Sequence, residues 1–109
     1  MTESSTAEFV DLAVQIVRFV DDHNPGFVES EFVDADGRRH VLMDKAPIFT
    51  NEDLDRESQY PQADAVQCRA VRFWRDASGR ELVAVKTIES VEGLSGFVVL
   101  REQVSPLER

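Results

Sequence analysis

Two segments of this chain repeat one pattern: an apolar run, a short polar turn that ends in a glycine-arginine pair, and a second apolar run. The turns contain Gly37-Arg38 and Gly79-Arg80, and the two glycines lie 42 residues apart. Glycine adopts the positive φ values that tight turns between antiparallel strands require, and apolar residues flank such turns where the strands bury one face. The pattern therefore predicts two β-hairpins and a small antiparallel β structure.

The two hairpins and one further apolar run predict five strands. We expect them over residues 27–34, 39–45, 64–75, 81–87 and 97–101. The third strand is long, so a bend or bulge is expected near Arg69 or Ala70. The long connection of residues 46–64 either is functional or crosses the end of a barrel, and it is expected to carry a one-turn helix over residues 50–54.

The residues before the first hairpin follow the spacing of a helix. At about 100° per residue, five polar side chains fall in a narrow strip, and they are Glu8, Asp11, Gln15, Arg18 and Asp22. Ser5 and Glu8 have the spacing of a capping box, and Pro25-Gly26 would end the helix. The spacing predicts a helix over residues 5–23.

The apolar surface of this expected helix is wide. Its arc covers on the order of 220°, whereas an ordinary surface helix needs little more than 100°. One sheet face would not cover such an arc. The flank formed by Val10, Val14 and Val17 is therefore expected to lie in a groove or to meet a second copy of the chain.

Together these elements predict an α+β fold in one domain of residues 1–109. The N-terminal helix packs on a five-stranded antiparallel sheet or on a small half-open β-barrel built from the two hairpins, with the β domain over residues 27–101. Residues 1–4 and 105–109 are expected to be loose ends. A chain of 109 residues is long enough to bury its own core.

The charge of the chain is negative and unevenly distributed. With 21 acidic and 12 basic residues, the net charge is −9. Residues 1–64 hold 15 acids and 5 bases, whereas residues 65–109 hold 6 acids and 7 bases. Nucleic acids and anionic lipids are bound by basic residues, so the acidic half argues against both as partners. It favours a basic protein partner, or it serves only to keep the protein soluble.

A single cysteine, Cys68, excludes an intrachain disulfide and is compatible with a reducing compartment. The first six residues have neither the basic nor the apolar region of a signal peptide. The most apolar window, residues 7–20, is interrupted by charged side chains. We therefore expect a cytoplasmic protein that does not span a membrane.

The sequence contains no recognisable catalytic or metal-binding motif. His23 and His40 are scattered relative to Cys68, which lies in an expected strand and is interpreted as a buried, inert thiol. The turn from Asp34 to Gly37 lacks the glycine and the acid that a calcium loop needs at its sixth and twelfth positions, and it is interpreted as a hairpin turn. We expect no cofactor, no bound metal and no enzymatic activity.

The wide apolar arc and the missing catalytic motifs favour a non-catalytic protein–protein interaction module. In this hypothesis the chain self-associates as a homodimer through its N-terminal helix, with Val10, Val14 and Val17 in the interface. An unidentified basic protein is the other expected partner.

An alternative hypothesis is a small nucleic-acid-associated or translation-associated β-barrel. Arginine and aromatic side chains stack on bases, and Arg69, Arg72, Trp74 and Arg80 would form such a patch. Strand alternation places Arg72 and Trp74 on one face and Arg69 on the other, unless a bulge intervenes. A simpler interpretation makes Phe73 and Trp74 core residues that solvated arginines flank.

A third hypothesis, of a different class, is a small hydrolase or isomerase. It would use His40 as the acid or base. Its expected partner is Asp44, which lies four residues along the same expected strand, or another nearby acid.

Overall fold

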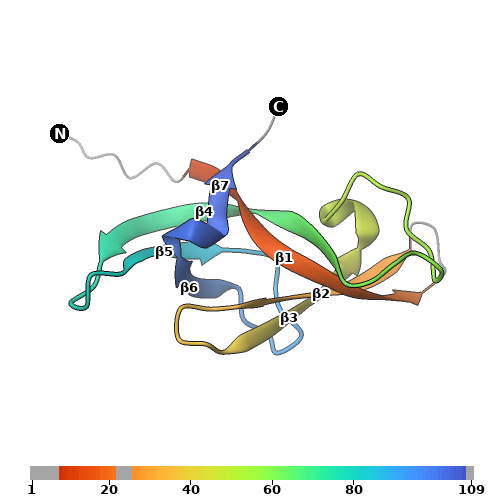
Figure 1. Ribbon diagram of the computed structural model, residues 1–109, viewed down its shortest axis with the longest axis horizontal. Helices are drawn as coiled ribbons and strands as arrows, with labels where there is room; N and C mark the ends of the chain where they lie inside the picture. The colour runs from red at the N-terminus through yellow and green to blue at the C-terminus, as the bar shows by residue number, and fades with distance from the viewer. Residues whose placement is uncertain (1–7, 22–25, 108–109) are drawn as a thin grey trace.

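The computed structural model describes residues 8–21 and 26–107, and most of its regular structure is β-strand (Figure 1). The strands are β1 (Glu8–Asp21), β2 (Phe27–Val33), β3 (Arg39–Lys45), β4 (Gln62–Arg75), β5 (Glu81–Lys86), β6 (Gly96–Leu100) and β7 (Val104–Pro106). Two short 3-10 helices, η1 (Ala46–Ile48) and η2 (Arg101–Gln103), follow β3 and β6. None of the helices in these ranges is long and apolar enough to cross a membrane.

The strands form one antiparallel sheet in the order β3-β2-β1-β4-β5-β6, which curls into a half-barrel (Figure 1). Two meanders, β1-β2-β3 and β4-β5-β6, are joined where residues 8–16 of β1 pair with β4. The other edge of β1 has two partners, because β7 pairs with residues 10–12 and β2 pairs with residues 15–21. β1 is therefore the strand that connects all other parts of the sheet.

The expected N-terminal helix is wrong, since residues 8–21 form β1; residues 5–7 and 22–23 lie outside the described residues. Every second side chain from residue 10 to residue 16 is at most 3% exposed, and these are Val10, Leu12, Val14 and Ile16. Ala13 and Gln15 between them are exposed. This is the two-residue period of a strand, and β-branched valines favour strands over helices. The α+β class is therefore wrong too, and the fold is a nearly all-β half-barrel.

The core lies on the concave side of the curled sheet. Its largest fully buried apolar side chains come from six of the strands, and they are Leu12, Ile16, Val28, Leu42, Val66, Val83, Val85 and Val99. Burial of each contributes roughly 1.5–3 kcal/mol relative to exposure. Ala46 and Phe49, from the connection between β3 and β4, are 6% and 3% exposed and belong to the same core.

Both predicted hairpins are confirmed, with turns at Gly37 (φ 85°) and Gly79 (φ 92°). In each turn an aspartate, Asp34 or Asp76, donates its N–H to the carbonyl four residues later. Its carboxylate accepts the N–H groups of the residues two and four positions on. A third turn with the same main-chain geometry begins at Ser90 and joins β5 to β6. The calcium-like spacing near Gly37 therefore belongs to a hairpin turn, as interpreted.

The five predicted strands are confirmed as β2 to β6, each end within two residues of its expected place. The bulge expected in the long strand is also present, because the register between β4 and β5 shifts between Ala70 and Arg72. A 14-residue strand in a curled sheet bends most readily where one extra residue interrupts the ladder.

Two smaller expectations are wrong. Residues 50–54 form no helix; η1 lies earlier in the connection, and the Thr50 hydroxyl accepts the Glu52 N–H at 3.1 Å in a turn. Residues 105–109 are not a loose end throughout, because Ser105 and Pro106 pair with β1. Residues 1–4 and 108–109 lie outside the described residues.

Candidate functional site

The bulge in β4 determines which side chains share the outer, convex face of the half-barrel. The register with β5 slips between Ala70 and Arg72, which leaves Val71 as an extra residue. Ala70 is buried and points into the core, so its neighbour Arg69 points outward. Without the bulge, Arg72 would point inward like Ala70. The extra residue turns Arg72 outward, and Trp74, two residues later, points the same way. Three of the four residues of the expected patch therefore share one face.

Neighbouring strands extend this surface. Lys86 of β5 lies opposite Arg69, and Val98 of β6 lies two strands across from Arg72. Val71 and Val98 are 45% and 38% exposed. We define the outer-face patch as Arg69, Val71, Arg72, Trp74, Lys86 and Val98. Sequence reasoning missed Lys86 and the two valines, although counting the register back from the Gly79 turn past the expected bulge would have paired Lys86 with Arg69.

The basic side chains of the outer-face patch lack the salt bridges that several other arginines of the protein form. Several arginines outside the patch form salt bridges of 2.6 to 2.9 Å, and they are Arg18, Arg39, Arg75 and Arg80. Across residues 8–21 and 26–107, Arg69, Arg72 and Lys86 form none. The Arg72 guanidinium lies over the Trp74 ring, 4.4 Å from its centroid. The patch is therefore basic and partly apolar, with its charges available to a ligand.

The structure does not bring Arg80 to the patch. Its Nε lies 2.9 Å from Asp76 Oδ2, and its Nη1 donates to the Ala35 carbonyl at 2.8 Å. Arg80 thus ties the β4–β5 turn to the β2–β3 turn. The pKa of Asp76 is lowered to about 2, first because its carboxylate accepts the Arg80 main-chain N–H and further through Ser78 and the Arg80 side chain.

The valines expected in a dimer interface do not form an exposed helix flank. Val10 and Val14 are both 3% exposed in the core of the half-barrel. Val17 is half-buried where the register between β1 and β2 shifts. An interface through an N-terminal helix with these three residues is therefore wrong, because two of them already pack inside their own chain.

Of the two alternatives expected for His40, Asp44 or another nearby acid, the structure shows the second. The His40 Nε2 lies 2.8 Å from Oδ2 of Asp34, not at Asp44, and its ring packs against Phe32 and Phe97 with centroid distances of 5.4 and 4.5 Å. Burial, the largest influence, raises the pKa of Asp34, but the hydrogen bonds from His40 and from two turn N–H groups together lower it below its usual value. His40 is 4% exposed, so the pair lies under the turn rather than in an open site.

Cys68 is buried, as interpreted from the sequence, at 4% exposure. Burial, and then the negative charge of Asp11, raises the pKa of its thiol to about 11. The thiol is therefore protonated at neutral pH and is a poor nucleophile. In the part of the chain that the structure describes, no three His, Cys, Asp or Glu side chains lie close enough to hold a metal ion.

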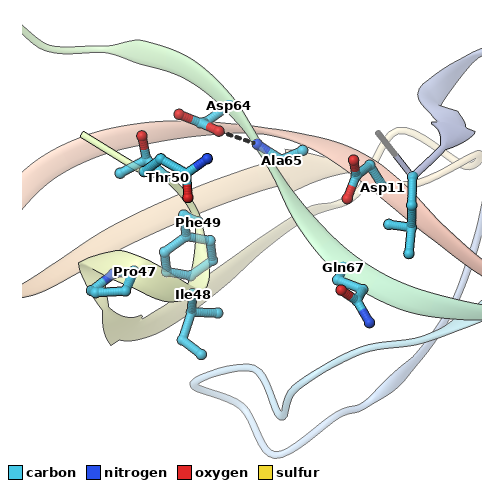
Figure 2. A pocket seen from close by; sticks show the side chains of 10 residues that line it. Asp11, Pro47, Ile48, Phe49, Thr50, Asp64, Ala65 and Gln67 are labelled. Carbon is cyan, nitrogen blue, oxygen red and sulfur yellow. Dashed lines mark hydrogen bonds between the residues drawn. The ribbon is translucent and has the colours of Figure 1, made fainter. Parts of the chain in front are cut away.

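A groove of about 300 Å³ lies beside the N-terminal half of β4 (Figure 2). Residues 47–51, which include the end of η1, form one wall, and Asp64, Ala65 and Gln67 of β4 form the other. Asp11 of β1 and Leu107 complete the lining. Two carboxylates and no basic side chain line this groove, so it differs in charge from the outer-face patch. Sequence reasoning singled out the connection that supplies one wall but found no site there.

The geometry is the basis for any assignment of function to these surfaces. Comparisons of the chain with protein-family models, with curated proteins and with solved structures found no match.

Proposed function

We propose that this protein is a non-catalytic module that binds another protein through the outer-face patch. One observation carries the proposal: the β4 bulge gathers Arg69, Arg72 and Trp74 on one convex face together with exposed valines. Arginine and tryptophan are the side chains that most often anchor protein interfaces, and they do so beside apolar contacts that exclude water. The same face carries three cations without acidic partners among the described residues.

The chemistry of the patch specifies the partner surface. Three positive charges around a tryptophan and two valines suit a segment in which acidic residues flank an apolar one. A second copy of this chain is a poorer fit, because each copy has a net charge of −9 and the two repel one another at long range. Val10 and Val14, on which the homodimer hypothesis was based, lie in the core. A cytoplasmic location stays a prediction from the sequence.

Two further observations support a non-catalytic role. The Cys68 thiol, with a pKa of about 11, is protonated and buried. The His40 ring is covered by Phe32 and Phe97, and its Nε2 is engaged by Asp34. Neither side chain has the exposure that a substrate-contacting base or nucleophile needs.

Binding of single-stranded nucleic acid is the second candidate. The observation that favours it is the Arg72 guanidinium stacked on Trp74, next to Arg69 and Lys86, because cations beside an aromatic ring can hold a phosphate backbone and stack a base. The net charge of −9 opposes it, since nucleic acid is repelled by the rest of the molecule. We therefore rank protein binding first.

Fluorescence of Trp74 tests the proposal, because this is the only tryptophan of the chain and it belongs to the patch. Short peptides are selected on the immobilised protein by peptide display, and the selected sequences are titrated against it. We expect acidic peptides with an apolar centre to be selected and to shift the Trp74 emission. Arg72→Ser should weaken their binding by about tenfold, the value of one charge-assisted contact.

Arg18→Ser is the matched control, because it removes an exposed arginine that pairs with Glu29 on another part of the sheet. Its peptide affinity should equal that of the original protein. An unchanged affinity in Arg72→Ser would contradict the proposal. If the peptides fail to bind but single-stranded oligo-dT quenches Trp74 in a salt-dependent manner, the second candidate replaces the first.

A further inference from the structure

The N-terminal half of β4 has an unpaired edge. Residues 62–70 pair with β1, but β5 pairs with β4 only from Arg69 onward. Over residues 62–68 the other edge has no strand partner among the described residues. At about 3.4 Å per residue this stretch is roughly 23 Å long. Its main-chain groups point alternately to the two edges, so an added strand would find donors and acceptors along it.

A fixed wall faces this edge across the groove (Figure 2). Phe49 is 3% exposed in the core and Thr50 is 7% exposed. Both donate their N–H groups to the Ala46 carbonyl, at 2.9 and 3.0 Å, while the Ala46 N–H donates to the Gly26 carbonyl. The wall is thus anchored from inside the half-barrel, and the groove exists without a ligand. Binding of an extended segment in the groove therefore requires little free energy for reorganisation of the protein.

The groove is acidic. Asp11 and Asp64 line it together with the neutral polar side chains of Thr50, Asn51 and Gln67, and no lysine or arginine does. The surrounding connection adds to the charge, because residues 44–64 hold six acids and two bases. These carboxylates attract a basic segment and repel an acidic one.

Asp64 has a second effect on the edge. Its Oδ1 accepts the Ala65 N–H at 3.0 Å, so the carboxylate lies against the backbone of β4. Charged side chains at an exposed strand are a common protection against pairing between identical chains. Here a second copy, itself at −9, meets a negative edge. A basic segment instead gains a counterion beside the strand it joins.

We propose that the groove beside β4 binds an extended basic segment of a partner protein, which adds to the unpaired edge of residues 62–68 as a strand. Main-chain hydrogen bonds to β4 supply the binding, and lysine or arginine side chains near Asp64 supply the selectivity. This surface is separate from the outer-face patch, and the inference does not rest on the proposed function.

Hydrogen exchange in the full chain tests the proposal, with a synthetic peptide in which lysine and valine alternate as the probe. We expect the peptide to slow exchange of alternate amide protons within residues 62–68 by at least about tenfold, because new cross-strand hydrogen bonds protect them. A peptide with the same sequence but N-methylated at every backbone nitrogen keeps its charge and loses the hydrogen-bond donors of both edges. It should give no protection. Equal protection by both peptides, or none by either, would overturn the proposal.

Variants separate this site from the patch. Asp64→Asn removes one charge but keeps an oxygen for the Ala65 N–H, and it should weaken lysine-valine peptide binding several-fold. Asp36→Asn removes an exposed charge at a remote turn and should leave the affinity unchanged. Arg72→Ser should also leave it unchanged, so loss of patch binding and loss of groove binding are distinguishable. Equal affinity in Asp64→Asn, or dimerisation through this edge in sedimentation, would contradict the inference.

Discussion

The Nε2 atom of His40 lies 2.8 Å from the Oδ2 atom of Asp34, so the first hairpin turn is attached to the aromatic cluster beneath it. The other ring nitrogen, Nδ1, is buried without a hydrogen-bond partner among the described residues. Asp34 also accepts two main-chain N–H groups of its own turn. This carboxylate therefore accepts hydrogen bonds from the turn and contacts a buried ring of the core at the same time.

Replacing that carboxylate should destabilise the protein measurably. Asp34→Ala leaves the buried Nε2 of His40 and two turn N–H groups without their acceptor, so we expect the free energy of unfolding to fall by about 1–3 kcal/mol. Urea denaturation followed by circular dichroism measures it. Asp36→Ala, in the same turn but exposed, should change it by less than about 0.5 kcal/mol. Equal effects of the two substitutions would contradict the role of Asp34.

The second hairpin turn should respond to acid. The pKa of Asp76 is lowered from 3.8 to about 2, chiefly by the Arg80 main-chain N–H. Because the folded value is the lower one, the stabilisation is present above pH 3.8 and is lost as the pH falls toward 2. NMR titration of the Asp76 carboxyl carbon should give a midpoint near 2, well below the usual value of 3.8. A midpoint near 3.8 would show that the hydrogen bonds do not form in solution.

Alkali should weaken the fold through Cys68. Its pKa is raised from 9.0 to about 11, so the folded state holds the thiol proton more tightly than the unfolded state does. Stabilisation from this group is complete below pH 9 and declines as the pH rises toward 11. Cys68→Ser should flatten this decline in denaturation curves recorded at several pH values. At neutral pH, alkylation of the native thiol should proceed only as fast as the protein opens.

The strand assignment of residues 8–21 predicts a two-residue period of sensitivity. Leu12→Ala removes a fully buried side chain and should cost about 2–5 kcal/mol. Gln15→Ala lies on the exposed face and should change stability by less than about 0.5 kcal/mol. Comparable losses at Ala13→Ser and Val14→Ala would argue against the alternation, since only the second of these positions is buried.

Glycine is required at the second hairpin turn for its backbone conformation alone. Gly79 has a φ of 92°, and a Cβ atom built there would meet nothing within 4 Å. Gly79→Ala should therefore cost about 1–2 kcal/mol from backbone strain and nothing from crowding. Gly96, whose added Cβ would also meet nothing, lacks the positive φ and is the matched control. Thermal denaturation of both variants compares them, and an equal loss at Gly96→Ala would refute the explanation.

Turn chemistry made the hairpins predictable. A glycine after three small residues, two of them polar, has few alternatives to a tight turn, so strands β2 to β5 follow from Gly37 and Gly79. The bulge was predictable as well, because a strand as long as β4 must bend to stay in a curled sheet. These signals are local, since they depend on a few neighbouring residues.

β1 was mispredicted because its sequence fits two periods. Asp11 and Gln15 are four residues apart, which places them on one side of a helix. In a strand the same two residues lie on one face, and Val10, Leu12 and Val14 lie on the other. What decides between them is pairing with β4, β2 and β7, which no local pattern contains. The same limit applies to the groove beside β4, since its walls lie far apart in the chain and meet only when Phe49 enters the core.

The shared edge of β1 has a consequence for the order of assembly. One portion of that edge is completed by β2, which starts at Phe27, and the other by β7, which ends at Pro106. During synthesis this edge of β1 therefore stays incomplete until residues 104–106 have been made and have folded back onto it. Sheets that are closed by such distant segments typically fold in milliseconds to seconds. A chain shortened before residue 104 would leave the edge of residues 10–12 unpaired, and an unpaired strand edge promotes aggregation.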